Sequence, residues 1–235
     1  MTLASSASAL KVPIAAAPVT WNNNDLENWR PRIPFPDILD RIAGAGYTAT
    51  EYDGSFGTDS AIVTTEAGKR GLVFCGSYQW FDLQTKGDVI AETLNLVSTL
   101  ELLQAIHCEH LIVADALRPE RVAIAGAVPA DGSAALGDDG FARIASNAHR
   151  VAAIAAGYGI RSHYHNHVGT YVETPDEVES LVGELDLAQV DLCFDTGHFA
   201  FGGGDALRFV EAHLDTIGYV HLKDVNATVL AEAKA

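Results

Sequence analysis

The sequence predicts an α/β fold, a parallel (β/α)8 TIM barrel, on three observations. Apolar runs of strand length alternate with longer amphipathic stretches along the chain, the pattern of β-then-α units that form a parallel sheet. Seven such units can be counted in the sequence, and this regularity favours a barrel over an open doubly wound sheet. Neither a G-x-G-x-x-G nor a Walker sequence follows any of these strands, which disfavours a nucleotide-binding fold.

The expected elements follow one another in regular order. Strands are expected over residues 12–19, 47–52, 72–76, 110–114, 160–165, 190–194 and 217–222. Helices are expected over residues 36–46, 59–69, 87–106, 141–156, from 175 onward, and 205–214. Pro36 suits the first turn of a helix, and Thr174 followed by Pro175 is a helix start with its N-cap. Residues 123–140, rich in Gly, Ala and Pro, are expected to form an elaborated active-site loop.

The length suits a single barrel domain over residues 1–235, with residues 1–11 as a disordered tail. The ending VNATVLAEAKA predicts the beginning of a seventh helix. No sequence is left for a final strand, so we expect a barrel truncated before strand 8, with its final helix and strand missing.

Composition excludes several classes of partner. The net charge of −16 and the absence of a basic stripe exclude nucleic acid and an anionic membrane surface as partners. No apolar run reaches the roughly 18 residues of a membrane-spanning helix. The odd number and wide spacing of the three cysteines do not suggest a disulfide framework. Cys75 and Cys193 lie in apolar strand-like runs, which predicts buried free thiols and a reducing cytoplasm. Most of the charge is explained by solubility, although it also suits a cation with a neutral polyol or sugar.

The strand over residues 160–165 ends in the run His-Tyr-His-Asn-His. Period-two alternation places His163, His165 and His167 on one face. Active sites of parallel barrels lie at the carboxyl ends of the strands. If this face points inward, three imidazoles, which are common metal ligands, point into the mouth of the barrel.

The next two strands also end in polar groups. Asp195 follows a buried apolar strand, where a carboxylate needs a partner such as a metal; the alternative is that it only caps the next helical turn. His198 lies three residues on. His221 and Lys223 share a face at the end of the last strand, although Lys223 could instead form a surface pair with Asp224.

Earlier strands offer weaker candidates. Glu51 closes the second strand, Trp21 and Asn22 follow the first, and Asp115 follows the fourth. Each is a candidate for substrate contact.

Chemistry next to a carbonyl suits these groups. A divalent cation chelates a carbonyl and a hydroxyl oxygen and lowers the pKa of the adjacent C–H. A nearby base then removes the proton. Isomerisation, epimerisation and β-elimination of water share this first step, and the residues alone do not separate them.

Three runs carry a family resemblance: YHNHVGTYVETPDEV, FDTGHFAFGGGDAL and IGYVHLKDV. They resemble the inosose dehydratase branch of the xylose isomerase-like TIM barrel (sugar phosphate isomerase/epimerase) superfamily. The segments APVTWNNND and GYTATEYDGSFG are similar to its opening strands, so the resemblance covers essentially the whole chain.

The resemblance implies a metal-dependent dehydratase of inositol catabolism that acts on 2-keto-myo-inositol or a related keto-sugar. It implies a bound divalent ion, Mn or Co, with Zn and Mg as alternatives. The implied ligands are Asp195, His221 and His165, with His163 as the alternate for the third. The superfamily's fourth ligand, a Glu on strand eight, has no counterpart in this chain.

The resemblance also implies that His198 and Lys223 contact the substrate and that Glu51 is an acid of the second strand that faces it. As a mechanistic hypothesis these three are expected to be catalytic, with His198 or Glu51 as the base and Lys223 at the enolate oxygen. From their places at strand ends, the residues expected at the substrate are Trp21, Asn22, His163, His167 and Asp115. Two alternatives stay open: a sugar isomerase or epimerase of the same superfamily, and a truncated, catalytically weak binding or interaction protein. Exposed sheet edges in an incomplete barrel would favour a homo-oligomer.

Overall fold

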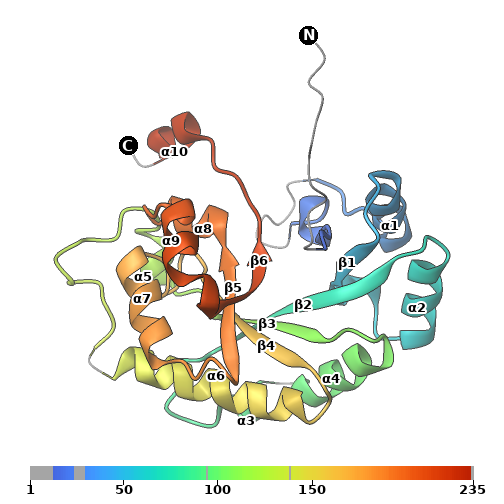
Figure 1. Ribbon diagram of the computed structural model, residues 1–235, viewed down its shortest axis with the longest axis horizontal. Helices are drawn as coiled ribbons and strands as arrows, with labels where there is room; N and C mark the ends of the chain where they lie inside the picture. Colours follow the sequence, from blue (N-terminus) through green and yellow to red (C-terminus); the bar gives the residue numbers. More distant parts are fainter. Residues whose placement is uncertain (1–12, 24–29, 94, 138, 234–235) are drawn as a thin grey trace. The chain divides into compact units, whose positions relative to one another are not determined.

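The structure, a computed structural model, describes residues 13–23, 30–93, 95–137 and 139–233 (Figure 1). The chain divides into two compact units, residues 1–76 with 106–108 and residues 77–105 with 109–235. The single domain expected over residues 1–235 stays a prediction. The tail expected over residues 1–11 lies outside the described residues.

The first unit holds a short strand and two helices. Its elements are the 3-10 turns Pro18–Thr20 and Gly54–Phe56, α1 (Phe35–Gly44), β1 (Ala49–Tyr52) and α2 (Ser60–Gly68). Ile38, Leu39 and Ile42 recur at helical spacing in α1, and all three are fully buried. The buried face of α1 lies against α2.

The strand expected over residues 12–19 is wrong. Within the described part, 13–19, only Ala16 forms a bridge, to Thr50, and Pro18 opens a 3-10 turn instead. Pro13 and Pro18 both lack the backbone N–H that a sheet ladder needs, so this apolar run cannot pair as a continuous strand.

Five parallel strands organise the second unit. They are β2 (Val73–Phe81), which enters the unit at residue 77, β3 (His110–Asp115), β4 (Arg161–His165), β5 (Val190–Asp195) and β6 (Ile217–His221). They pair in the order of the sequence. In register, His165 lies beside Cys193 and Asp195 beside His221, so the carboxyl ends of β4, β5 and β6 meet at one edge.

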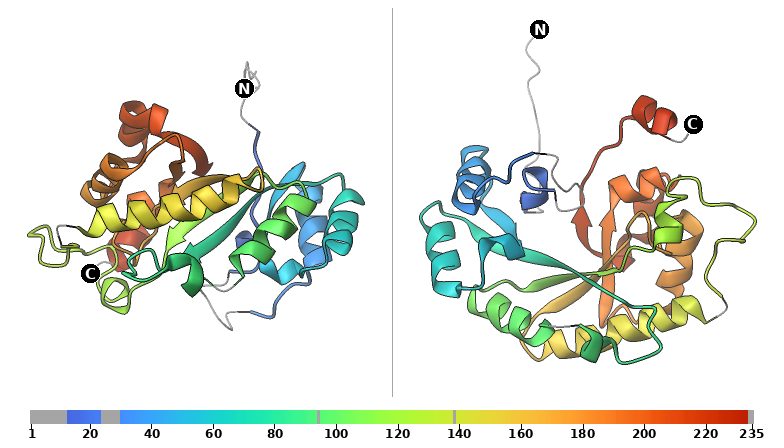
Figure 2. Two further views of the ribbon diagram at one scale, coloured as in Figure 1. Left: turned by 90° about the horizontal axis from the view of Figure 1, so that it is seen from below. Right: turned by 180° about the vertical axis from the view of Figure 1, so that it is seen from behind.

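Helices follow each of these strands. They are α3 (Val89–Glu92), α4 (Leu96–Ala105), α5 (Pro119–Val122), α6 (Gly140–Ala156), α7 (Pro175–Glu184), α8 (Thr196–Phe201), α9 (Ala206–His213) and α10 (Ala227–Ala233). The longest, α6, runs along β3, β4 and β5 (Figures 1 and 2). Over the residues described, none of the helices is long and apolar enough to cross a bilayer.

Two expectations about the helices meet different outcomes. The helix expected over residues 87–106 is broken into α3 and α4, because Asn95 adopts a left-handed conformation with φ of 82° that interrupts the helical hydrogen bonds. A loop is confirmed between α5 and α6, where the described residues form turns and bends without a strand or a helix, although Gly140 already begins α6; the place of this loop at an active site stays a prediction.

Strand β5 has one apolar and one more polar face. On β5, Leu192 and Phe194 alternate with Asp191, Cys193 and Asp195, and all five are buried. Phe194 packs against rings of α8 and α9. The helices therefore cover the apolar face, and the chemistry-bearing side chains share the other.

Candidate functional site

The buried carboxylate of Asp195, at the carboxyl end of β5, uses its two oxygens differently. Oδ1 accepts a hydrogen bond from the backbone N–H of His198 at 2.8 Å and caps α8. Oδ2 faces a group of side chains. The helix cap and the site, weighed as alternatives from the sequence, are therefore both functions of this one side chain.

Four nitrogen-bearing side chains converge on Oδ2 of Asp195. The distances are 2.6 Å from Lys223 Nζ, 3.2 Å from His165 Nε2, 3.7 Å from His221 Nδ1 and 4.0 Å from His198 Nε2. The rings of His165 and His221 lie 4.8 Å apart between centroids. The structure thus brings together the three residues expected to bind metal and two of those expected to be catalytic.

The surroundings set the charge of these groups. Burial alone would raise the pKa of the Asp195 carboxyl, but the hydrogen bond with His165 and the electrostatic interactions with His165, His198 and Lys223 outweigh it and hold that pKa well below its usual value. Burial lowers the pKa of His165 to about 3 and that of His198 to about 2. At neutral pH the site therefore presents an ionised carboxylate beside neutral imidazoles.

The donor set fits a divalent metal. Among the described residues, two groups could hold an ion: His165 with Asp195 and His198, and His165 with Cys193 and His221, with donor atoms within 4.8 Å of one another in each group. The buried Nδ1 of His165 has no hydrogen-bond partner in the described part of the chain. Neutral imidazole, carboxylate and thiol donors suit zinc or cobalt.

Two side chains that the sequence did not single out hold the site together. The Asn166 amide accepts a hydrogen bond from the backbone N–H of Asp195 at 2.8 Å and donates one to its carbonyl at 3.2 Å. The Thr196 hydroxyl accepts from the N–H of Lys223 at 2.9 Å and donates to its carbonyl at 2.7 Å. An amide directly after a strand was the available signal for Asn166.

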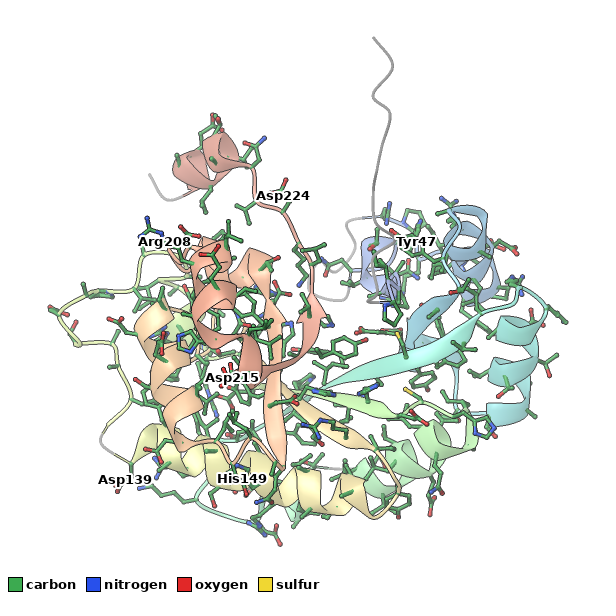
Figure 3. The ribbon with its side chains drawn as sticks, viewed as in Figure 1. Tyr47, Asp139, His149, Arg208, Asp215 and Asp224 are labelled. Carbon is green, nitrogen blue, oxygen red and sulfur yellow. The ribbon has the colours of Figure 1, made fainter. Side chains whose placement is uncertain are left out.

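Lys223 therefore pairs with Asp195 instead of forming the surface pair with Asp224. Asp224 lies on the segment that leads from β6 to α10 (Figure 3). Its carboxylate accepts a hydrogen bond from the backbone N–H of Val225.

The other two histidines of the β4 run lie at different depths. The ring centroids of His167 and His198 lie 3.9 Å apart, so His167 is beside the site. His163 lies apart from it, because its Nδ1 bonds to Asp191 and its Nε2 lies 2.8 Å from Nδ1 of His110. His163 is on the expected face but two residues nearer the start of β4, where its register partner is Asp191.

The side chain of Asp115 hydrogen-bonds to the segment that follows β2. Its buried carboxylate accepts hydrogen bonds from the backbone N–H of Leu83 at 3.0 Å and from the Gln84 amide at 2.5 Å. Burial raises its pKa to about 6. Its contact with substrate stays a prediction.

Trp21, Asn22 and Glu51 belong to the first unit. The Asn22 amide donates to the carbonyl of Ile33 at 2.8 Å and accepts from its N–H at 3.0 Å, so it supports the local fold. The roles of these three residues at the substrate stay predictions.

Comparison with known proteins gives consistent matches. A family model described as "Xylose isomerase-like TIM barrel" matches residues 39–232. Rhizopine catabolism protein MocC of Rhizobium meliloti is 30% identical over 230 residues, which are 97% of this chain and 69% of that protein. Inosose dehydratase of Salmonella typhimurium is 30% identical over 215 residues, which are 91% of this chain and 70% of that one.

A solved structure shares the fold at lower identity. The crystal structure of the IOLI protein with a binding zinc atom matches with a TM-score of 0.65 and 12% identity, and covers 91% of this chain and 74% of that one. At this identity the likeness concerns the fold alone.

Proposed function

The chain belongs to the xylose isomerase-like TIM barrel family, and from this premise we propose that it is a metal-dependent dehydratase. Its substrate is 2-keto-myo-inositol (inosose) or a related keto-sugar, which loses water through an enediolate. The observation that carries the proposal is the convergence of imidazoles and an ammonium group on one oxygen of Asp195. The relative named inosose dehydratase, 30% identical over most of this chain, supports the substrate class.

His165, Asp195 and His221 would hold the metal. They come from the ends of three adjacent strands, and Oδ2 of Asp195 lies 3.2 Å from His165 Nε2 and 3.7 Å from His221 Nδ1. When bound, the ion would polarise the substrate ketone and lower the pKa of the adjacent C–H. The zinc atom bound in the IOLI crystal structure supports a divalent ion of this kind.

The chain's own residues would move the protons. His198 lies beside the site, with its Nε2 atom 4.0 Å from Oδ2 of Asp195, and we assign its imidazole as the base that accepts the α-proton. Glu51 is the second candidate base. The Lys223 ammonium would donate a hydrogen bond to the negatively charged oxygen that develops. The β C–O bond then breaks, the hydroxyl takes up a proton and leaves as water, and the resulting enol tautomerises to a second ketone.

The test combines metal analysis with turnover. We expect purified protein loaded with zinc, cobalt or manganese to bind about one ion per site and to convert inosose to a product lighter by one water, as measured by mass spectrometry. Turnover of a keto-sugar without loss of water would replace the dehydratase with the isomerase or epimerase alternative. Neither metal binding nor turnover would favour a binding protein.

A matched pair of variants separates ligation from capping. Asp195→Asn keeps a good helix cap but removes the charge, so metal affinity should fall by at least roughly 100-fold and turnover should be lost. Asp205→Asn is the control, because Asp205 caps α9 through the N–H of Arg208 at 3.1 Å and is exposed. An Asp195→Asn enzyme with full turnover would overturn the assignment.

A further inference from the structure

Cys193 lies directly below the site on the same face of β5. It precedes Asp195 by two residues, so both side chains point to one side of the sheet. In register it lies between His165 on β4 and Tyr219 on β6. The side chain is fully buried, and the proposed mechanism gives it no role.

The thiol is within reach of the proposed metal ligands. Sγ of Cys193, a ring nitrogen of His165 and a ring nitrogen of His221 all lie within 4.8 Å of one another. The second, independent observation is the Nδ1 atom of His165, on a residue that is 2% exposed, which meets no hydrogen-bond partner over the residues described. A buried nitrogen in that state points to a group it could bind.

We propose that Cys193 is a further metal ligand, which supplies a thiolate alongside His165 and His221. This inference rests on the metal-dependent function proposed above. On binding, the S–H bond breaks, the proton passes to solvent, and sulfur bonds to the ion without a change of oxidation state. A buried cysteine with only a structural role is otherwise inert.

The consequence is metal selectivity. Two imidazoles and one thiolate are donors of the kind zinc takes. Thiolate favours zinc and cobalt over magnesium and manganese, which prefer oxygen donors. The site would therefore retain zinc or cobalt in competition with manganese.

Cobalt reports the sulfur directly, because a thiolate bound to Co²⁺ gives a charge-transfer band in the near ultraviolet. The double variant Cys75→Ser with Cys108→Ser leaves Cys193 as the sole thiol, and both replaced residues lie in the first unit. We expect this variant to develop the band at one equivalent of Co²⁺. Adding Cys193→Ser should abolish the band and lower the affinity for zinc relative to manganese, while circular dichroism checks the fold.

The outcomes distinguish the two proposals. Stoichiometric Co²⁺ binding and inosose turnover without the band would overturn the thiolate ligand and leave the proposed function standing. Failure to bind any of the metals would overturn both. The wild-type and double-variant spectra decide the matter even if Cys193→Ser does not fold.

Discussion

Replacing Asn166 by alanine removes the amide that links the carboxyl ends of β4 and β5. Its two hydrogen bonds hold the backbone of Asp195, at 2.8 and 3.2 Å, and both partners are fully buried. The variant should therefore loosen the residue on which the whole site depends.

The expected loss of stability follows from these contacts. Alanine leaves one N–H and one carbonyl of Asp195 without their partner, and each orphaned buried group costs roughly 1–3 kcal/mol. The free energy of unfolding should fall by about 2–6 kcal/mol, against a typical total of about 5–15 kcal/mol. Metal affinity should fall by roughly 10–100-fold, the usual effect of removing a group that orients a ligand.

Asn147→Ala is the matched control. The buried Asn147 amide also makes two hydrogen bonds, to the carbonyls of Leu83 at 2.9 Å and Thr85 at 3.1 Å, and both carbonyls lie outside the site. This variant should lose about 1–3 kcal/mol and keep the metal affinity of the wild type.

Urea unfolding of the metal-free proteins and competition with a coloured chelator measure the two effects separately. If Asn166→Ala is destabilised but binds metal like the wild type, the amide supports the fold alone. If both variants lose affinity equally, the effect is general loosening, and the reasoning about Asp195 fails.

Two further predictions concern the fold around the site. Burial raises the pKa of Asp115 from 3.8 to about 6, so the folded state binds the proton more tightly than the unfolded state. Stability should fall as pH rises from about 4 to 7, by about 3 kcal/mol from this group; Asp115→Asn should remove that part of the slope in urea unfolding. In Gly218→Ala the new methyl would overlap the carboxylate of Asp191, so thermal unfolding should show a loss of about 1–3 kcal/mol. Gly183→Ala, with nothing within 4 Å, should be neutral or slightly stabilising; equal effects at both glycines would contradict the packing argument.

Much of the fold could be predicted because its signals are local. Strand-length apolar runs identified β1 to β6, and Thr174 with Pro175 marked the start of α7, where the capping box is present. The failures have local causes as well. Residues 12–19 are apolar, yet their prolines prevent pairing as a continuous strand. The helix expected over residues 87–106 is broken at the left-handed Asn95, and the hydrophobic periodicity on which the prediction depended does not reveal this break.

The sequence predicted which strand ends form the candidate site, but not how far along its strand each side chain lies. Parallel strands bring their carboxyl ends together, so His165, Asp195 and His221 were expected to meet. Alternation gives the face of a side chain but not its height along the strand. His163 is two residues before His165 along β4, a rise of about 6.6 Å. This displacement places its ring beside Asp191 and not beside Asp195.

The spacing of the run Asp-Thr-Gly-His follows from the geometry of one turn. The Asp195 carboxylate caps α8 by accepting a hydrogen bond from the backbone N–H of His198. The His198 ring therefore lies beside this carboxylate. Thr196 holds the backbone of Lys223, and at Gly197 a Cβ would lie 2.6 Å from Cβ of Lys223. Asp195, Thr196 and Gly197 thus each have a structural reason that is independent of any substrate, whereas His198 contributes only its backbone N–H to the turn. Similarity to other proteins in this run therefore indicates that the site has the same arrangement. The identity of the substrate depends on residues outside the run that face the ligand.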